Sequence, residues 1–158
     1  MKSPERVLVL YEQGRGGMAA IDLARELAER EKANLTVVGV APKAPSGPRC
    51  GNSAIEYNEA VADSVLGDLD KARERLGQAA ERASFVLLID GADQTLEQLA
   101  ESGGFDLVLL PARRRPLRRG ARHPEAGRLR LSVGAEIRIV APASQTRRPR
   151  PGVAADGS

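Results

Sequence analysis

The sequence predicts an α/β fold, namely an open, doubly wound sheet of five parallel strands with helices on both faces. Short apolar runs alternate along the chain with longer segments in which apolar residues recur at helical spacing, the pattern of β-α-β units. Most of these runs contain no polar residue, which is typical of parallel strands that helices cover on both sides. The 158 residues are enough for one such domain with a sizeable core.

The first part of the chain predicts three strands and two helices. Val7-Leu8-Val9-Leu10-Tyr11 is a continuous β-prone run and predicts a central strand. Proline and glycine between residues 41 and 52 predict a loop. Ser53 is placed to cap the second helix, with Glu56 three residues later in a capping-box pattern. The strands are expected at residues 6–12, 34–40 and 84–90, and the helices at residues 18–30 and 53–81.

The second part predicts two helices and two strands. Leu107-Val108-Leu109-Leu110 reads as a buried strand that Pro111 closes. The last strand alternates Ile137 and Ile139 with polar residues, so we expect one of its faces to be less buried, as at a sheet edge or an interface. The helices are expected at residues 94–101 and 124–133, and the strands at residues 105–110 and 135–140.

Charge is divided unequally along the chain. Residues 1–104 contain 12 basic and 17 acidic side chains, a net charge of −5, whereas residues 105–158 contain 12 basic and 4 acidic ones, a net charge of +8. A basic end on an acidic body predicts an anion-facing patch or solvated basic segments. We expect a single domain over residues 5–142, followed by a disordered tail rich in Arg, Pro and Gly over residues 143–158.

The residue inventory disfavours several classes of site. Cys50 is the only cysteine, so the chain can form neither an internal disulfide nor a thiolate metal cluster. His123 is the only histidine, and its place in a basic loop disfavours a catalytic or metal-binding role. Aromatic residues make up only 3% of the chain, which disfavours nucleic acid as a partner. No apolar run approaches the roughly 20 residues that span a bilayer, and the first residues do not resemble a signal peptide. We therefore expect a cytoplasmic protein without a membrane partner.

A glycine-rich turn follows the first strand. Gly14-Arg15-Gly16-Gly17 opens a helix, as does the loop that binds a dinucleotide pyrophosphate. That kind of site also needs an acidic residue at the end of the second strand, and here the strand ends with Val40-Ala41-Pro42. We therefore interpret the glycines as a tight turn between strand and helix.

The strongest candidate ligand residues lie after the first and fourth strands, where open α/β sheets bind their ligands. Glu12 ends the first strand and could hold ribose hydroxyls, or it could be a solvated strand end. Residues 113–122 contain six arginines, including Arg113, Arg114, Arg115 and Arg118. The loop is either simply solvated, or a clamp for phosphates, or a contact surface for nucleic acid or an acidic protein. Asp90 and Asp106 flank strands and are interpreted as turn or capping groups.

Five segments together resemble one known family, the universal stress proteins or UspA-like domains. The resemblance covers residues 5–142 and implies a homodimer, often formed through the last strand, which here spans residues 135–140. Many members bind ATP and others do not. The segments are Val7-Leu8-Val9-Leu10-Tyr11-Glu12, Leu35-Thr36-Val37-Val38-Gly39-Val40, Gly91-Ala92-Asp93, Phe105-Asp106-Leu107-Val108-Leu109-Leu110 and Ile137-Arg138-Ile139-Val140.

The resemblance assigns ligand roles to two residues, but the family's phosphate-binding loop is absent from this sequence. In ATP-binding members an aspartate that ends the first strand contacts the nucleotide, and Glu12 stands there; a valine near the end of the second strand meets adenine, and Val40 matches it. The family's phosphate loop is G-x2-G-x9-G-[ST], but this chain has Pro111 at the first glycine, Arg114 near the second and His123-Pro124-Glu125 near the Gly-Ser pair. Proline has no N–H to offer a phosphate, so we expect no ATP or other cofactor in the family manner.

Three functions remain open, in decreasing order of support. The first is a non-enzymatic, dimeric domain that acts in stress response or regulation through protein contacts. The second is a binder of a nucleotide or other small anion through Glu12, Val40 and the arginine loop. The third is an enzyme such as a slow nucleotide hydrolase, for which no catalytic group is evident.

Overall fold

The computed structural model describes residues 4–42, 54–89, 94–113, 123–132 and 134–142. Cys50, Ser53, Asp90, Val133 and most of the arginine loop lie outside these ranges, as does the tail over residues 143–158. The predictions made for those residues therefore remain predictions. None of the described helices is long and apolar enough to cross a membrane.

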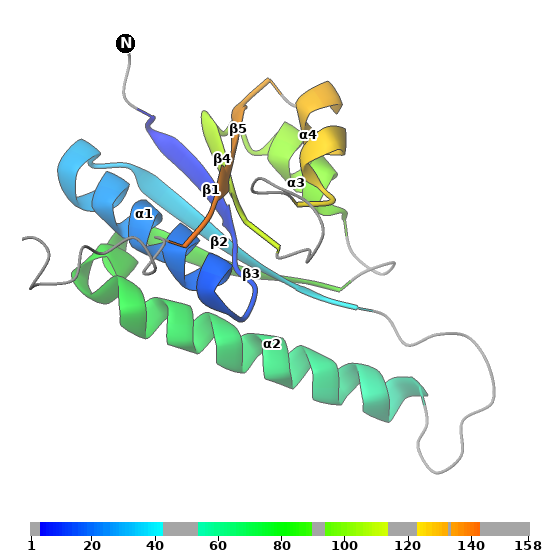
Figure 1. Cartoon of the computed structure of the whole chain (residues 1–158). Helices are drawn as coiled ribbons and strands as arrows, with labels where there is room; N and C mark the ends of the chain where they lie inside the picture. The colour runs from blue at the N-terminus through cyan, green and yellow to red at the C-terminus, as the bar shows by residue number, and fades with distance from the viewer. Residues whose placement is uncertain (1–3, 43–53, 90–93, 114–122, 133, 143–158) are drawn as a thin grey trace, which may run out of the picture.

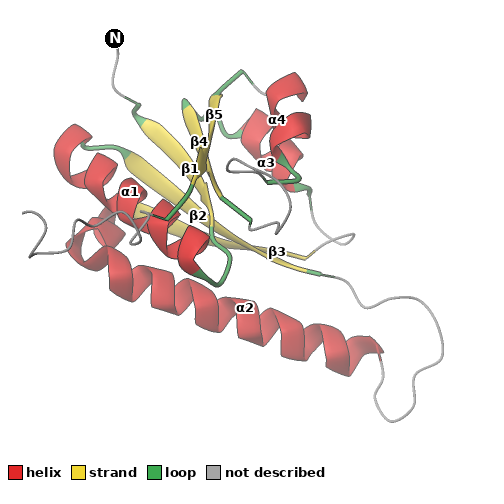
Figure 2. Ribbon diagram, in the orientation of Figure 1, coloured by secondary structure: helices red, strands yellow, loops and turns green. Residues whose placement is uncertain are grey.

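The described residues form a five-stranded, all-parallel sheet with helices on both faces, which confirms the predicted fold (Figures 1 and 2). The strand order is β3-β2-β1-β4-β5, so β1 is central and β5 is at an edge, as predicted. The strands are β1 (Arg6–Leu10), β2 (Asn34–Ala41), β3 (Ala83–Ile89), β4 (Leu107–Pro111) and β5 (Glu136–Val140). The helices are α1 (Arg15–Glu31), α2 (Ala54–Leu76), the 3-10 helix η1 (Gly77–Arg82), α3 (Leu96–Ser102) and α4 (Ala126–Ser132).

Alternate residues of each strand point to two separate cores. On one face, Val7 and Val9 of β1 pack with the apolar sides of α1 and α2. On the other face, Leu8 and Leu10 pack with α3 and α4. Val7, Leu8 and Val9 are completely buried, which explains why β1 reads as an unbroken apolar run with no polar alternation.

Several element boundaries differ from the predictions by a few residues, and three of the differences bear on the site or the helices. The second helix ends at Leu76 instead of residue 81, because Gly77 takes a φ of 59° and the chain continues as a 3-10 helix. β1 ends at Leu10, so Glu12 lies in the following turn, not in the strand. Pro111, predicted to close the fourth strand, lies within β4 opposite Val140.

Two short polar motifs fix the ends of elements. Thr95 and Gln98 form a capping box at the start of α3, with Thr95 Oγ1 accepting from Gln98 N at 3.1 Å and Gln98 Oε1 accepting from Thr95 N at 2.9 Å. Asp106 Oδ2 accepts from the backbone N–H groups of Glu5 and Arg6 at 2.9 and 3.0 Å. Asp106 therefore ties the start of β4 to the start of β1, which agrees with the capping role predicted for it.

Candidate functional site

The candidate site lies at the carboxyl ends of β1 and β4, where this sheet changes direction. β1 connects through α1 to β2 on one side, whereas β4 lies on its other side. The site is therefore at the topological switch point, where open α/β sheets bind ligands. Glu12 follows the end of β1 by two residues, and its carboxylate contacts His123, which lies just before α4.

The glycine turn holds α1 unusually close to the backbone of the site. A Cβ at Gly17 would stand 1.7 Å from the carbonyl oxygen of Glu12, and one at Gly16 would stand 2.5 Å from the carbonyl oxygen of Ala112. No side chain fits at such distances, so these glycines serve the packing of the helix against the ends of β1 and β4. This supports the interpretation of the glycine run as a tight turn.

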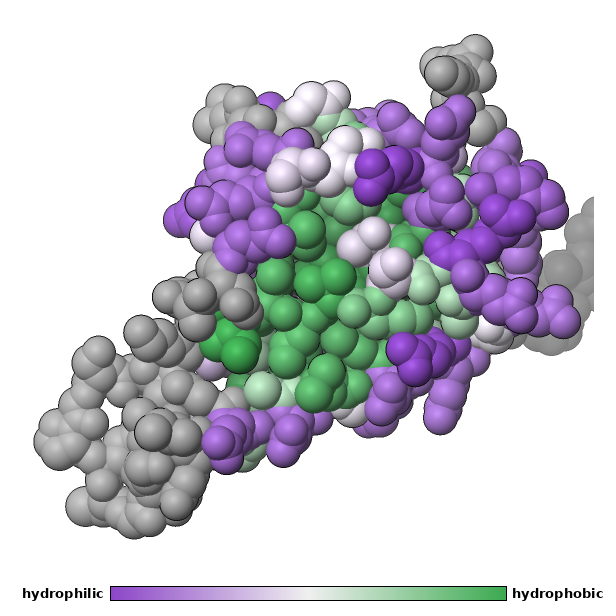
Figure 3. Space-filling model, turned by 180° about the vertical axis from the view of Figure 1, so that it is seen from behind, coloured by the Kyte–Doolittle hydropathy of each residue, from purple (hydrophilic) through white to green (hydrophobic). Residues whose placement is uncertain are grey.

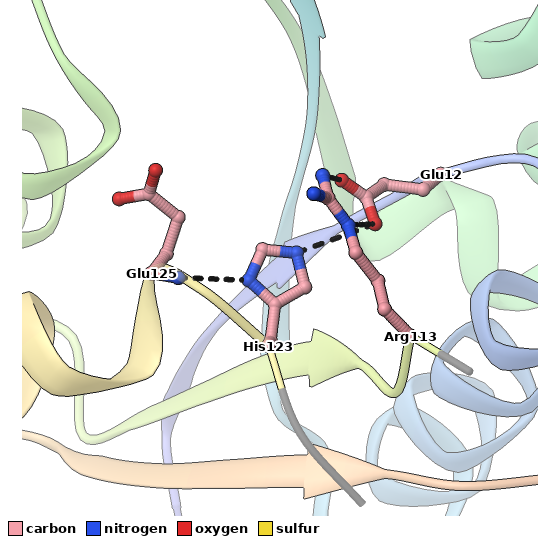
Figure 4. A network of polar contacts seen from close by, with 4 residues as sticks. All are labelled: Glu12, Arg113, His123 and Glu125. Carbon is pink, nitrogen blue, oxygen red and sulfur yellow. Dashed lines mark hydrogen bonds and ion pairs between the residues drawn. The ribbon is translucent and has the colours of Figure 1, made fainter. Parts of the chain in front are cut away.

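The carboxylate of Glu12 is the centre of the site (Figure 4). Arg113, just after β4, donates from Nε to Glu12 Oε1 at 3.0 Å and from Nη2 to Oε2, which makes a bidentate ion pair. The side chain of Glu12 is 26% exposed and that of Arg113 is 53% exposed. Arg113 therefore covers the carboxylate from the solvent side.

His123 approaches the same carboxylate from the protein interior. Its side chain is 1% exposed, and Nε2 lies 3.3 Å from Glu12 Oε1. The backbone N–H of Glu125 donates to His123 Nδ1 at 3.1 Å. Because Nδ1 accepts this hydrogen bond, the neutral ring carries its proton on Nε2 and donates it to Glu12. Both ring nitrogens are therefore engaged by the protein.

These contacts change how readily Glu12 binds a proton. Burial of the carboxyl group raises its pKa, but the hydrogen bonds from His123 and Arg113, together with the positive charge of Arg113, outweigh burial. The net effect lowers the pKa of Glu12 from its ordinary 4.5 to about 2. In return, the hydrogen bond with Glu12 raises the pKa of Arg113. Glu12 is therefore a stable anion that the protein neutralises itself.

The structure brings together only some of the residues that the sequence singled out. Glu12 and Arg113 are in direct contact. Val40 lies on the neighbouring strand and is 37% exposed. Leu10 pairs with Val38, and the N–H of Tyr11 donates to Val38 O at 2.8 Å; continued by two residues, this register sets Val40 level with Glu12. Arg114, Arg115 and Arg118 lie outside the described residues.

The role of His123 was missed at the sequence level. It lies 111 residues from Glu12 in the chain, so no local pattern connects the two. The available signals were indirect: it is the only histidine, it precedes Pro124 and the last predicted helix, and it stands near the Gly-Ser position of the family loop. These signals did not reveal that the ring would be buried against a carboxylate.

Among the described residues the site shows no metal-binding cluster, and the ring of His123 is shielded from solvent. No group of three or more His, Cys, Asp or Glu side chains there could hold a metal ion. The buried ring of His123, with both nitrogens engaged, cannot contact a substrate from solvent. The arrangement is instead an ion pair with a buried hydrogen-bond support.

The fold and site together define the class of protein: a doubly wound α/β domain with the Rossmann-type strand order 3-2-1-4-5 and a polar site at the switch point of the sheet. The chain belongs to the universal stress protein family, whose family model matches residues 4–129. No relative was found among curated proteins at a significant level of sequence similarity.

Several solved structures share this fold. A universal stress protein family member from Burkholderia pseudomallei is 21% identical with a TM-score of 0.66, over 86% of this chain and 95% of that chain. UspA from Lactobacillus plantarum is 19% identical with a TM-score of 0.71, over 86% of this chain and 97% of that chain. A universal stress protein in complex with cAMP is 16% identical with a TM-score of 0.57, over 87% of this chain and 97% of that chain.

Proposed function

We propose that this chain is a non-enzymatic universal stress protein domain of the cytoplasm that acts in stress response or regulation as a dimer, without family-type ATP binding. One observation carries the proposal. The carboxylate at the nucleotide-contacting position, Glu12, already accepts hydrogen bonds from Arg113 and from the buried ring of His123. The protein's own side chains thus already use the carboxylate oxygens of Glu12 that a nucleotide would need as acceptors.

The energetic argument concerns what a nucleotide would have to displace. To hydrogen-bond Glu12, a ribose would have to replace the bidentate guanidinium of Arg113, a charge-assisted contact, with neutral hydroxyl donors. Phosphates would further need backbone N–H groups after β4, where Pro111 has none. Each exchange costs free energy without an equal gain, so binding in the family manner is unfavourable.

Nucleotide binding is tested by the thermal unfolding of the full chain. We expect ATP, AMP, cAMP and dAMP at about millimolar concentration, with and without Mg²⁺, to shift the midpoint by less than about 1 °C. A ligand present at 100 times its Kd would stabilise the fold by about 2.7 kcal/mol and shift the midpoint by several degrees. A shift of that size with any of these nucleotides would overturn the proposal.

A second candidate function is the binding of a nucleotide or other small anion through Arg113. Its guanidinium is half exposed, Val40 nearby is exposed as well, and a similar structure was determined with cAMP bound. If a ligand does shift the midpoint, Arg113→Ala should abolish the shift. Arg30→Ala is the matched control, since Arg30 is an exposed arginine at the far end of α1, paired with Glu26. A shift that survives Arg113→Ala would refute this candidate.

The dimer belongs to the same proposal and is assigned to β5. This edge strand carries Glu136 and Arg138 on one side, and the two side chains pair at 2.7 Å. If two copies pair in antiparallel fashion about a two-fold axis at Ile137, Glu136 of each copy lies opposite Arg138 of the other. Opposite charges directly across an antiparallel pair stabilise it.

Charge reversal tests the β5 dimer. Arg138→Glu places Glu136 opposite a second carboxylate and is expected to weaken dimerisation by about tenfold, equivalent to 1.4 kcal/mol over the two symmetric contacts. The double variant Glu136→Arg with Arg138→Glu restores the opposite charges and should restore the dimer. Sedimentation equilibrium measures both. A chain that is monomeric at tens of micromolar, or a dimer indifferent to Arg138→Glu, would contradict this assignment.

A further inference from the structure

The second edge of the sheet, β3, lacks within its own sequence the charged and proline residues that protect edge strands. Its seven residues, Ala-Ser-Phe-Val-Leu-Leu-Ile, include no charged residue, no proline and no glycine. Segments of this length with high β-propensity and no charge are those that pair most readily with further strands. Among the described strands, β2 alone pairs with β3. Because β3 has a strand on one side only, alternate N–H and C=O groups along it point away from the sheet.

The side chains of β3 are as open as its position suggests. Phe85, Val86 and Leu87 are each partly exposed, although residues of this type prefer burial. Arg73 lies over the ring of Phe85 at 4.5 Å from its centroid and covers that residue on the α2 face. Seen from behind, where β3 lies nearer the viewer, the molecule shows a broad apolar area (Figure 3). Val86 of β3 and the exposed Val40 of β2 both belong to the α3 face of the sheet.

The two edges of the sheet are therefore unlike. β5 presents Glu136 and Arg138, both exposed, which select an oppositely charged neighbour. β3 has no charged residue that could attract or repel a neighbouring strand. Its apolar residues point in turn to both faces of the sheet. An uncharged strand with the same preferences fits this edge best, and a charged peptide gains nothing from it.

We propose that β3 is a self-association surface on which a second copy of this chain adds its own β3 in antiparallel orientation, with a two-fold axis at Val86. In this register Val86 faces its counterpart, Phe85 faces Leu87 and Ser84 faces Leu88 of the other copy. The pairing is isologous, so each contact occurs twice. Aromatic–aliphatic and β-branched pairs across an antiparallel ladder are stabilising. The pairing also makes the exposed apolar areas of the two copies adjacent.

The second copy is favoured over other occupants for a structural reason. A two-fold antiparallel pairing of β3 brings no like charges together, because the strand has none. Each copy supplies the complementary strand already extended and held in a sheet, so pairing costs little backbone entropy. A disordered peptide from another protein would have to be ordered first.

Charge complementation at the axis tests the proposal in the full chain. Val86→Lys and Val86→Glu each place two like charges directly opposite and are expected to weaken association at this edge by at least about tenfold. An equimolar mixture of the two variants should restore association, since lysine then faces glutamate. Sedimentation velocity over a wide concentration range reads this out. The measurements are made in the Arg138→Glu background, so that β5 does not contribute.

Two controls keep the result interpretable. Met18→Lys changes a 37% exposed apolar residue of α1, a helix that packs on β1, β2 and β4, and it should leave association unchanged. If a Val86 variant fails to fold, Ser84→Lys takes its place; it lies at an exposed position of β3 and should also weaken association. Amide hydrogen exchange over residues 83–89 should slow with concentration in the parent chain and not in Val86→Lys. Association that persists in both Val86 variants, that mixing fails to restore, or that is absent from the parent chain would overturn the proposal.

Discussion

Gly17→Ala is expected to destabilise the fold by about 3 kcal/mol or more, the largest effect expected of any single change at the site. The added Cβ would stand 1.7 Å from the carbonyl oxygen of Glu12, a distance that real atoms do not reach. The obstacle is backbone, which cannot rotate away as a flexible side chain could. Either the start of α1 or the turn that holds Glu12 must move. Urea denaturation should show a markedly lower midpoint.

Gly67→Ala is the matched control for this prediction. Gly67 lies inside α2, and a Cβ there would meet nothing within 4 Å. Alanine is favoured over glycine in a helix interior by about 1 kcal/mol, so this variant should be stabilised. The same chemical change is thus expected to have opposite signs at the two positions. Equal effects at both would show that α1 does not pack closely on the turn.

Acid should remove a large part of the stability that Glu12 provides. The pKa of Glu12 is about 2 in the folded chain against an ordinary 4.5, so the unfolded chain binds the proton more readily. The stabilisation is complete above pH 4.5 and is lost as the pH falls toward 2. The shift corresponds to about 3 kcal/mol, of which about 2 kcal/mol should be lost between pH 6 and pH 3. Glu12→Gln should abolish this part of the pH dependence.

The measurement compares the free energy of unfolding of the two proteins as the pH falls. Glu12→Gln should lie well below the parent chain near neutrality and approach it in acid. Asp22→Asn is the control, because Asp22 forms a bidentate pair with Arg75 at 2.7 and 2.9 Å on an exposed surface. Exposed pairs contribute about 0–1 kcal/mol, so this variant should be nearly neutral. A constant difference between the Glu12→Gln and parent curves at every pH would contradict the prediction.

The fold could be predicted because its signals are local. The unbroken apolar run of β1 indicates a strand buried on both faces, and the alternation in β5 indicates a strand buried on one face. In the structure β1 is central and β5 is at an edge. Boundaries were less accessible. α2 ends at Leu76 because the next residue, Gly77, takes a left-handed conformation. The sequence indicates only that glycine weakens a helix, not which φ it adopts.

The site was only half predictable. Glu12 and Arg113 were expected near the same edge, because strands of a parallel sheet end on the same side. Their bidentate geometry depends on the side chain directions after β1 and β4, which no spacing specifies. The contact with His123 joins residues 111 positions apart. Its partner on the other side, the N–H of Glu125, depends on how the chain enters α4.

An open sheet has two edge strands, and in this protein the two differ in sequence and charge. A ring or barrel closes on itself and stops growing, whereas a sheet that pairs with a two-fold mate at both edges keeps growing unless the successive rotations bring the last copy back to the first. Molecules that use both borders at once would line up as a row of alternating contacts. The number of copies in such a row would increase with protein concentration and would be limited by the affinity of the weaker interface. The amount of protein present would therefore determine the size of the assembly.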